Sequence, residues 1–185
     1  RLLDSLLRAV PSADVLHPFR ADDARSYCWD GLLCRPCWGV YRTPARTVAA
    51  VLCPNHVSAL HDLGLLLSQC DAVVLAASAA SPLDDDARDH LLLALTRGLG
   101  NLLVFLDTRG VPEVQEQDRA ERELRLLLLL NGLPGDDVPV IRGEPGGSGE
   151  ELRRAIDNRL AMPRRDPDAP FRMLVHSWDH GGSTE

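Results

Sequence analysis

Three cysteines near the start of the chain are of the residue type that binds metals tightly. Cys28, Cys34 and Cys37 lie close together, and Cys53 or His56 could supply a fourth ligand for a structural zinc ion. A single C-x-x-C pair without a second pair at fixed spacing is a weak signal, however. Free thiols are the alternative, and we expect them rather than a bound metal.

Two other clusters invite a ligand-binding interpretation. The glycine-rich stretch 143–149 could cradle a phosphate, but Glu150 and Glu151 follow it at the start of a predicted helix and would repel an anion. The acidic run 84–86 could hold a cation, although a helix N-terminus already favours acidic residues there as caps and dipole partners. We therefore expect no ligand at either place.

Composition and charge exclude several classes of protein. The chain has 185 residues, of which 45% are hydrophobic and 25% are charged, as in an ordinary globular domain. Its net charge of -7 argues against a dominant nucleic-acid surface, so we expect no direct nucleic-acid binding. Apolar runs are too short to cross a membrane, and no secretory segment precedes the five cysteines. We expect a cytoplasmic protein with reduced thiols.

The elements that must position these residues alternate between strand and helix patterns. Predicted helices cover 2–10, 55–69, 84–99, 112–130 and 149–160, and predicted strands cover 38–42, 47–52, 72–75, 101–106 and 138–141. Residues 11–37 have no periodicity and are expected to form a long loop. Alternating strands and helices indicate βαβ units, which build a mostly parallel sheet with helices on both faces.

Several short stretches occur in an order and spacing that one known family shares. They are Gly31, Tyr41-x-Thr43-Pro44-x-Arg46, Cys53-Pro54-x-His56, residues 71–75, Phe105-Leu106, Pro134-Gly135-Asp136-Asp137-x-Pro139-Val140-Ile141-Arg142-Gly143 and Asp168-Ala169-Pro170-Phe171. Over nearly its whole length the chain resembles the G domain of the bacterial elongation factor Tu family of translational GTPases. The stretch from Pro134 to Gly143 is the strongest single match.

The resemblance implies an α/β fold of the P-loop NTPase type, with the three-layer sandwich of a Ras-like G domain. It implies a degenerate G domain over residues 1–162, followed by a linker and the first strand of a truncated β-barrel domain over 163–185. In this family the strand that leads into the phosphate loop is central, flanked by the strands expected at 47–52 and 72–75. That strand would lie before residue 1.

The positions that the family uses for nucleotide chemistry carry other residue types here. The effector-loop threonine is replaced by Leu33, and in the D-C-P-G-H element Leu52 stands for the metal-side aspartate, followed by Cys53, Pro54 and Asn55. The guanine-reading N-K-x-D is replaced by Asp107, Thr108, Arg109 and Gly110, and the base-supporting loop after Gly143 begins with Glu144. His56 occupies the place of the catalytic histidine. We expect all of these nucleotide-binding positions, and the histidine, to be vestigial.

The losses indicate a pseudo-GTPase that serves as a protein-binding or scaffold module, without a required cofactor. The alternative is a divergent GTP-binding elongation factor-like GTPase whose phosphate loop lies upstream of residue 1; GTP or GDP and Mg²⁺ would then be its ligands. A partner protein is expected in either case. Leu126, Leu127, Leu128, Leu129 and Leu130 close a predicted surface helix and are the candidate partner surface.

Overall fold

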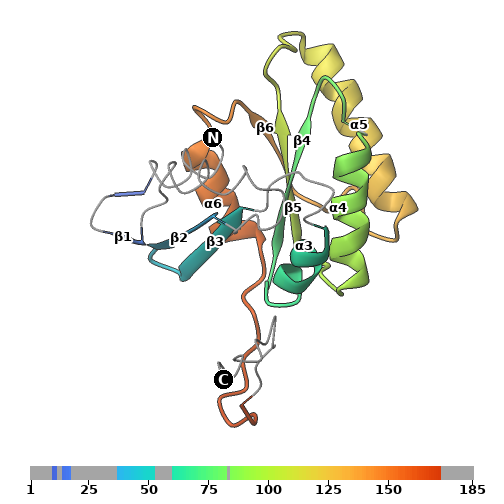
Figure 1. Cartoon of the computed structure of the whole chain (residues 1–185). Coiled ribbons are helices and arrows are strands. Elements are labelled where there is room, and N and C mark those ends of the chain that lie inside the picture. Colours follow the sequence, from blue (N-terminus) through green and yellow to red (C-terminus); the bar gives the residue numbers. More distant parts are fainter. Residues whose placement is uncertain (1–9, 12–13, 18–36, 53–59, 83, 172–185) are drawn as a thin grey trace, which may run out of the picture.

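The computed structural model describes residues 10–11, 14–17, 37–52, 60–82 and 84–171 (Figure 1). Its elements in chain order are β1 (Val15–His17), β2 (Cys37–Arg42), β3 (Thr47–Leu52), α3 (Leu60–Leu67), β4 (Val73–Ser78), α4 (Asp85–Thr96), β5 (Leu102–Asp107), α5 (Val114–Leu130), β6 (Val140–Gly143) and α6 (Gly149–Arg159). The α/β class expected from the sequence is confirmed.

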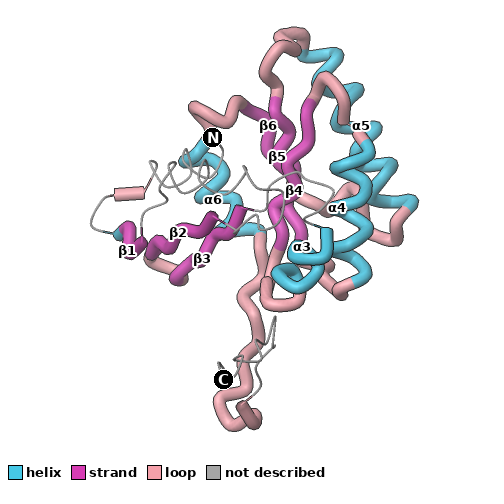
Figure 2. The backbone as a smooth tube through the Cα atoms, in the orientation of Figure 1, coloured by secondary structure: helices cyan, strands magenta, loops and turns pink. Residues whose placement is uncertain are grey.

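The described strands form two sheets rather than one. β4, β5 and β6 make a parallel sheet in that order, and β1, β2 and β3 make an antiparallel sheet (Figure 2). The three-stranded parallel sheet agrees with the expected α/β fold, whereas β1, β2 and β3 form a separate antiparallel sheet. β3 and β4 are not neighbours in a ladder, and no described strand lies between them, where the resemblance places the strand that leads into the phosphate loop.

The parallel sheet is covered on both faces, as expected. Leu102, Val104 and Leu106 of β5 belong to the core that contains α4 and α5. The alternate residues of β5, Leu103 and Phe105, belong to a second core that contains α6. β5 is thus buried on both faces, which explains its unbroken apolar sequence. In Figure 1 the green and yellow helices lie on one side of the sheet and the orange helix on the other.

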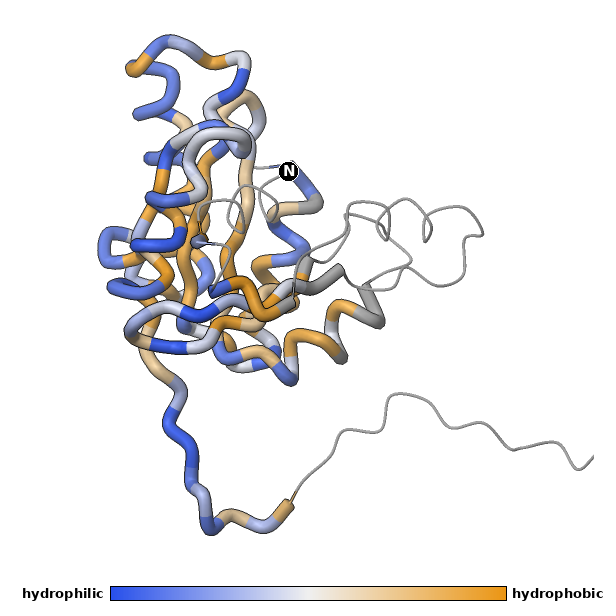
Figure 3. The backbone as a smooth tube through the Cα atoms, turned by 90° about the vertical axis from the view of Figure 1, so that its left-hand side faces the viewer, coloured by the Kyte–Doolittle hydropathy of each residue, from blue (hydrophilic) through white to orange (hydrophobic). Residues whose placement is uncertain are grey.

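The second core also holds the antiparallel sheet in place. Tyr41 of β2 is fully buried in it, and Val48 and Ala50 of β3 pack against it beside residues of α6 and β5. The two sheets therefore meet through packed side chains and through α6. The hydropathy of the residues agrees with this packing, since the buried strands are apolar and the tail after α6 is mostly hydrophilic (Figure 3).

Local signals set most of the element ends. The Asp84 side chain accepts a hydrogen bond from the backbone N–H of Ala87 at 2.7 Å, so the acidic run does cap α4. Gly98 follows with φ of 78°, a left-handed conformation that suits glycine and ends the helix. This is why α4 ends at Thr96 instead of reaching residue 99.

The two ends of the described chain contain a short strand, β1, and an exposed tail after α6. The segment 11–37 was expected to be a loop, but Val15–His17 forms β1 and pairs antiparallel with β2. A strand of three residues is too short to show periodicity, and it forms because β2 offers an open edge. Residues 161–171 form neither helix nor strand and are exposed. The strand expected over 171–177 lies outside the described residues except for Phe171, and the helix expected over 2–10 lies outside them except for Val10.

Candidate functional site at the carboxyl edge of the parallel sheet

The carboxyl ends of β4, β5 and β6 meet at one edge of the parallel sheet, the place where ligands bind in open α/β folds. The backbone N–H of Ala79 donates to the carbonyl oxygen of Asp107 at 2.8 Å. The N–H of Thr108 donates to the carbonyl of Gly143 at 3.0 Å. Asp107, Thr108 and Gly143, which the sequence marked as vestigial nucleotide positions, are therefore brought together at this edge.

The carboxylate of Asp107 is bound by the side chain of Arg109, two residues later in the chain. The Arg109 side chain donates from Nε to both carboxylate oxygens, at 3.0 and 2.9 Å, and from Nη2 to Oδ2 at 2.5 Å. Its backbone N–H adds a bond of 3.0 Å. Burial acts to raise the pKa of Asp107, yet the hydrogen bonds and charge of Arg109 outweigh it and lower that pKa below its usual value. The carboxylate is held ionised in a closed, local ion pair.

The turn after Asp107 contains a glycine at the position that the resemblance assigns to a guanine-reading acid. Thr108 accepts a hydrogen bond from the N–H of Val111 at 3.1 Å, which closes the turn. Gly110 lies within it at φ of 77°, in the left-handed region that side chains disfavour. Gly110 therefore has no side chain that could accept hydrogen bonds from a ligand.

The loop after β6 closes on itself in the same way. The carbonyl of Glu144 accepts the backbone N–H groups of Gly147 and Ser148, at 3.0 and 3.1 Å. These amides would be the donors of a phosphate cradle, and here they are used within the loop. A Cβ atom added to Gly143 would overlap the Ser148 side chain, with 2.8 Å to its Cβ. Glycine is therefore required at 143 by packing.

The phosphate and metal side of the expected site lies mostly outside the described residues. Leu33, Cys53, Pro54, Asn55 and His56 are not described, so the roles that the resemblance implies for them are untested. Leu52 ends β3, where its backbone is paired with that of Cys37.

The same holds for the zinc candidates. Cys28 and Cys34 are not described, and of Cys37 only the backbone at the start of β2 is known. Across the ranges that the structure covers, no three His, Cys, Asp or Glu side chains gather in a way that would hold a metal ion. The zinc hypothesis therefore stays untested.

The five leucines at the end of α5 divide into two groups. Leu128 is fully buried in the core that the parallel sheet shares with α4 and α5, and Leu127 packs against that core. Leu126, Leu129 and Leu130 are 56%, 61% and 76% exposed. The candidate partner surface thus narrows to these three residues, which share one helix face because they are spaced three and four apart.

Sequence reasoning missed the contact that joins the antiparallel sheet to α6. Arg46 donates from Nη2 to the carbonyl of Asp157 at 2.7 Å and from Nη1 to that of Leu160 at 3.1 Å. Thr43 donates to Oδ1 of Asp157 at 3.0 Å. We call Thr43, Arg46 and Asp157 the hairpin clamp. In the sequence, Thr43 and Arg46 are part of a short motif that indicates no contact with α6. No pattern around Asp157 identifies it as their partner.

None of the helices in the described ranges is both long and apolar enough to cross a bilayer. No protein-family model matches the chain, so its place in a family rests on the resemblance of residues and is a proposal.

Proposed function

We propose that this protein is a pseudo-GTPase related to elongation factor Tu, which binds a partner protein and has little or no GTP turnover. The proposal joins the resemblance of the chain to the geometry at the carboxyl edge of the parallel sheet. It concerns the guanine side of the site, where the side chains are described.

The observation that carries the proposal is the closed ion pair of Asp107 and Arg109 beside Gly110. Guanine selectivity in a G domain requires a carboxylate that is free to accept two N–H groups of the base. Gly110 offers no such group, and Asp107 already accepts one backbone and three side-chain hydrogen bonds from Arg109. Losing a bidentate charged contact to the base costs about 2–4 kcal/mol, which lowers the affinity roughly 30- to 1000-fold.

The protein-binding part of the proposal is supported by the surface of α5. Leu126, Leu129 and Leu130 expose apolar area on one helix face. Exposed apolar side chains that gather in one place are typical of surfaces that bind other proteins.

A titration of the full chain with fluorescent GDP and GTP, with and without Mg²⁺, tests the proposal. We expect no binding up to about 100 μM, which corresponds to an affinity weaker than roughly -5.5 kcal/mol. Sub-micromolar, Mg²⁺-dependent binding would refute the pseudo-GTPase and establish the alternative, a divergent GTP-binding elongation factor-like GTPase.

The variant Arg109→Ala sharpens this experiment because it frees the Asp107 carboxylate while leaving Gly110 in place. We expect it to bind neither nucleotide, since a free carboxylate at 107 does not replace the missing one at 110. Tight GDP binding by Arg109→Ala alone would show that the site is intact and merely closed, and this would contradict the proposal.

A further inference from the structure

The outer edge of β6 has backbone groups that no described strand uses. β6 pairs only with β5, with Val104 opposite Val140 and Leu106 opposite Arg142. The N–H groups of Val104 and Thr108 donate to the carbonyls of Pro139 and Gly143, so residues 139 and 143 face β5. Because successive residues of a strand alternate, Val140 and Arg142 direct their N–H and C=O groups to the open edge.

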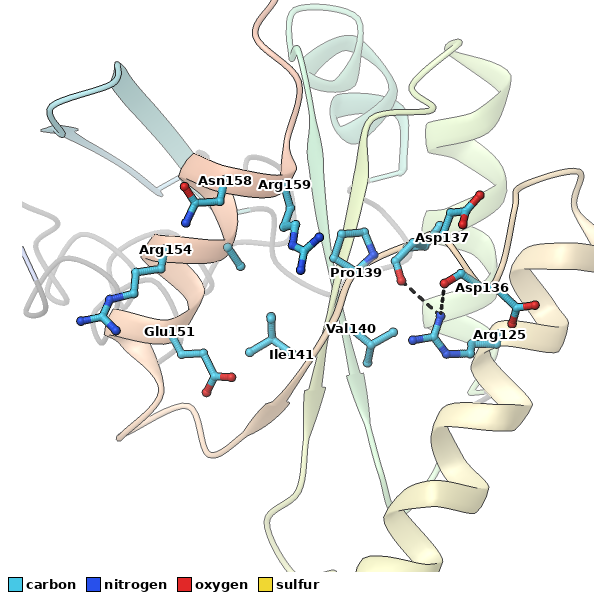
Figure 4. A pocket seen from close by; sticks show the side chains of 12 residues that line it. Arg125, Asp136, Asp137, Pro139, Val140, Ile141, Glu151, Arg154, Asn158 and Arg159 are labelled. Carbon is cyan, nitrogen blue, oxygen red and sulfur yellow. Dashed lines mark hydrogen bonds between the residues drawn. The ribbon is translucent and has the colours of Figure 1, made fainter.

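A groove of about 430 Å³ runs beside this edge, between α5 and α6 (Figure 4). Pro139, Val140 and Ile141 form its apolar floor. Val140 packs toward the α5 side of the sheet and Ile141 toward the α6 side, so the groove straddles the strand. Its place is therefore that of one more strand of the sheet, about 4.8 Å beyond β6 and between the same two layers.

The two walls of the groove differ in charge. On the α5 side, the Arg125 guanidinium is bound to Glu121 and to the carbonyls of Gly135, Asp136 and Val138, while the carboxylates of Asp136 and Asp137 are exposed. On the α6 side, Arg159 forms no hydrogen bond or ion pair with another described side chain. Figure 4 shows Arg159 and Asp137 on opposite sides of Pro139.

We propose that the β6 groove binds an extended segment of a partner protein, which adds a fourth strand to the parallel sheet. The segment forms main-chain hydrogen bonds with Val140 and Arg142, as in other cases of strand addition. Since side chains of a strand alternate between faces, it presents an acidic residue to Arg159 and a basic one to Asp137. This inference rests on the protein-binding part of the proposed function and names a surface for it other than the leucines of α5.

Charge and shape favour a peptide segment over other occupants. The lining contains three arginines (Arg125, Arg154, Arg159) and three acids (Asp136, Asp137, Glu151), a balance that does not attract nucleic acid. Side chains of folded elements stand on both sides of the strand in Figure 4. An extended chain is the occupant that can pair with a single open strand edge between two such walls.

The test is a selection of random ten-residue peptides, displayed on phage, against the full chain. Selected peptides are then synthesised and their affinity is measured by fluorescence anisotropy. We expect sequences with alternating acidic and basic positions. Arg159→Glu should weaken their binding about tenfold, in line with the loss of one charged contact, and changing the acidic residue of the peptide to lysine should restore it.

Arg122→Glu is the matched control, because Arg122 is an exposed arginine of α5 that does not line the groove. Val140→Pro is the second variant: it removes an outward N–H while sparing the bonds to β5, and it should abolish binding. Selection of no peptide would overturn the inference, as would peptides whose affinity is the same for wild type and Arg159→Glu. Neither result bears on nucleotide binding, which the titration with GDP and GTP measures separately.

Discussion

Replacing Arg46 with alanine should destabilise the protein by removing the central residue of the hairpin clamp. The side chain of Arg46 is only 13% exposed and that of Asp157 12%. The guanidinium of Arg46 binds the carbonyls of Asp157 and Leu160 at the C-terminal end of α6. The last carbonyl groups of a helix lack partners within the helix, and a positive charge is favourable there. Arg46, which lies in the turn between β2 and β3, therefore caps the C-terminal end of α6.

The expected loss follows from these two bonds. Hydrogen bonds to a charged group contribute about 1.5–3 kcal/mol each, or about 3–6 kcal/mol for two. Freeing a long side chain returns about 1–2 kcal/mol of conformational entropy. The net loss is about 2–4 kcal/mol, a large fraction of the 5–15 kcal/mol that is typical of domain stability. Arg46→Lys keeps the charge without the planar fork and should lose about half as much.

Urea denaturation followed by circular dichroism measures this loss as a lower midpoint at unchanged slope. Arg88→Ala is the matched control: the Nη1 of Arg88 lies 3.9 Å from Asp85, both side chains are exposed, and the change should stay within about 0.5 kcal/mol. If Arg46→Ala also stays within that range, the clamp does not hold the antiparallel sheet on α6, and the reasoning fails.

Three other substitutions have defined outcomes. The Tyr41 hydroxyl is buried and has no hydrogen-bond partner among the described residues, so Tyr41→Phe should leave the free energy of unfolding unchanged or raise it by up to about 1 kcal/mol; a loss above about 1 kcal/mol in urea would contradict this. A Cβ atom at Gly135 would overlap the backbone carbonyl of Arg125, so Gly135→Ala should lower the thermal midpoint by the equivalent of about 1–3 kcal/mol, and an unchanged midpoint would speak against that packing. Burial acts to raise the pKa of Glu121, but the hydrogen bonds and charges of Arg142 and Arg125 lower it below its usual value. This stabilisation is present above the unfolded-state pKa, near 4.5, and is lost as the pH falls through the lower folded-state value, so Glu121→Gln should flatten the stability profile on the acid side of pH 4.5; equal slopes for both proteins would refute the assignment.

Strong local patterns made much of the fold predictable. The strand at 47–52 has the predicted bounds. β5 and α5 were found because a continuous apolar run and a long amphipathic pattern are hard to mistake. Ends were displaced by one to three residues where a cap or a glycine conformation decides them, as at Gly98.

The rest depended on contacts between distant parts of the chain. β1 exists only because β2 offers an edge, and the division into two sheets concerns which strands are neighbours, a property that no local pattern carries. At the candidate site, the ends of neighbouring strands place Asp107 and Gly143 together. The ion pair of Asp107 with Arg109 depends on the geometry of the turn, which the sequence does not specify. The hydrogen bond from Thr43 to Asp157 joins residues 114 positions apart, so it could not be inferred from a local pattern.

The position of α6 between the two sheets has a consequence for how the domain opens. Leu152, Ala155 and Ile156 of α6 share one core with Tyr41 of β2 and with Phe105 of β5. Displacing α6 would expose both sheets at once, so the amide protons of β2, β3 and α6 should exchange with solvent as one cooperative unit. The exchange rates of β2 and β3 would then respond to the displacement of α6, although Leu52 ends β3 and α6 begins only at Gly149.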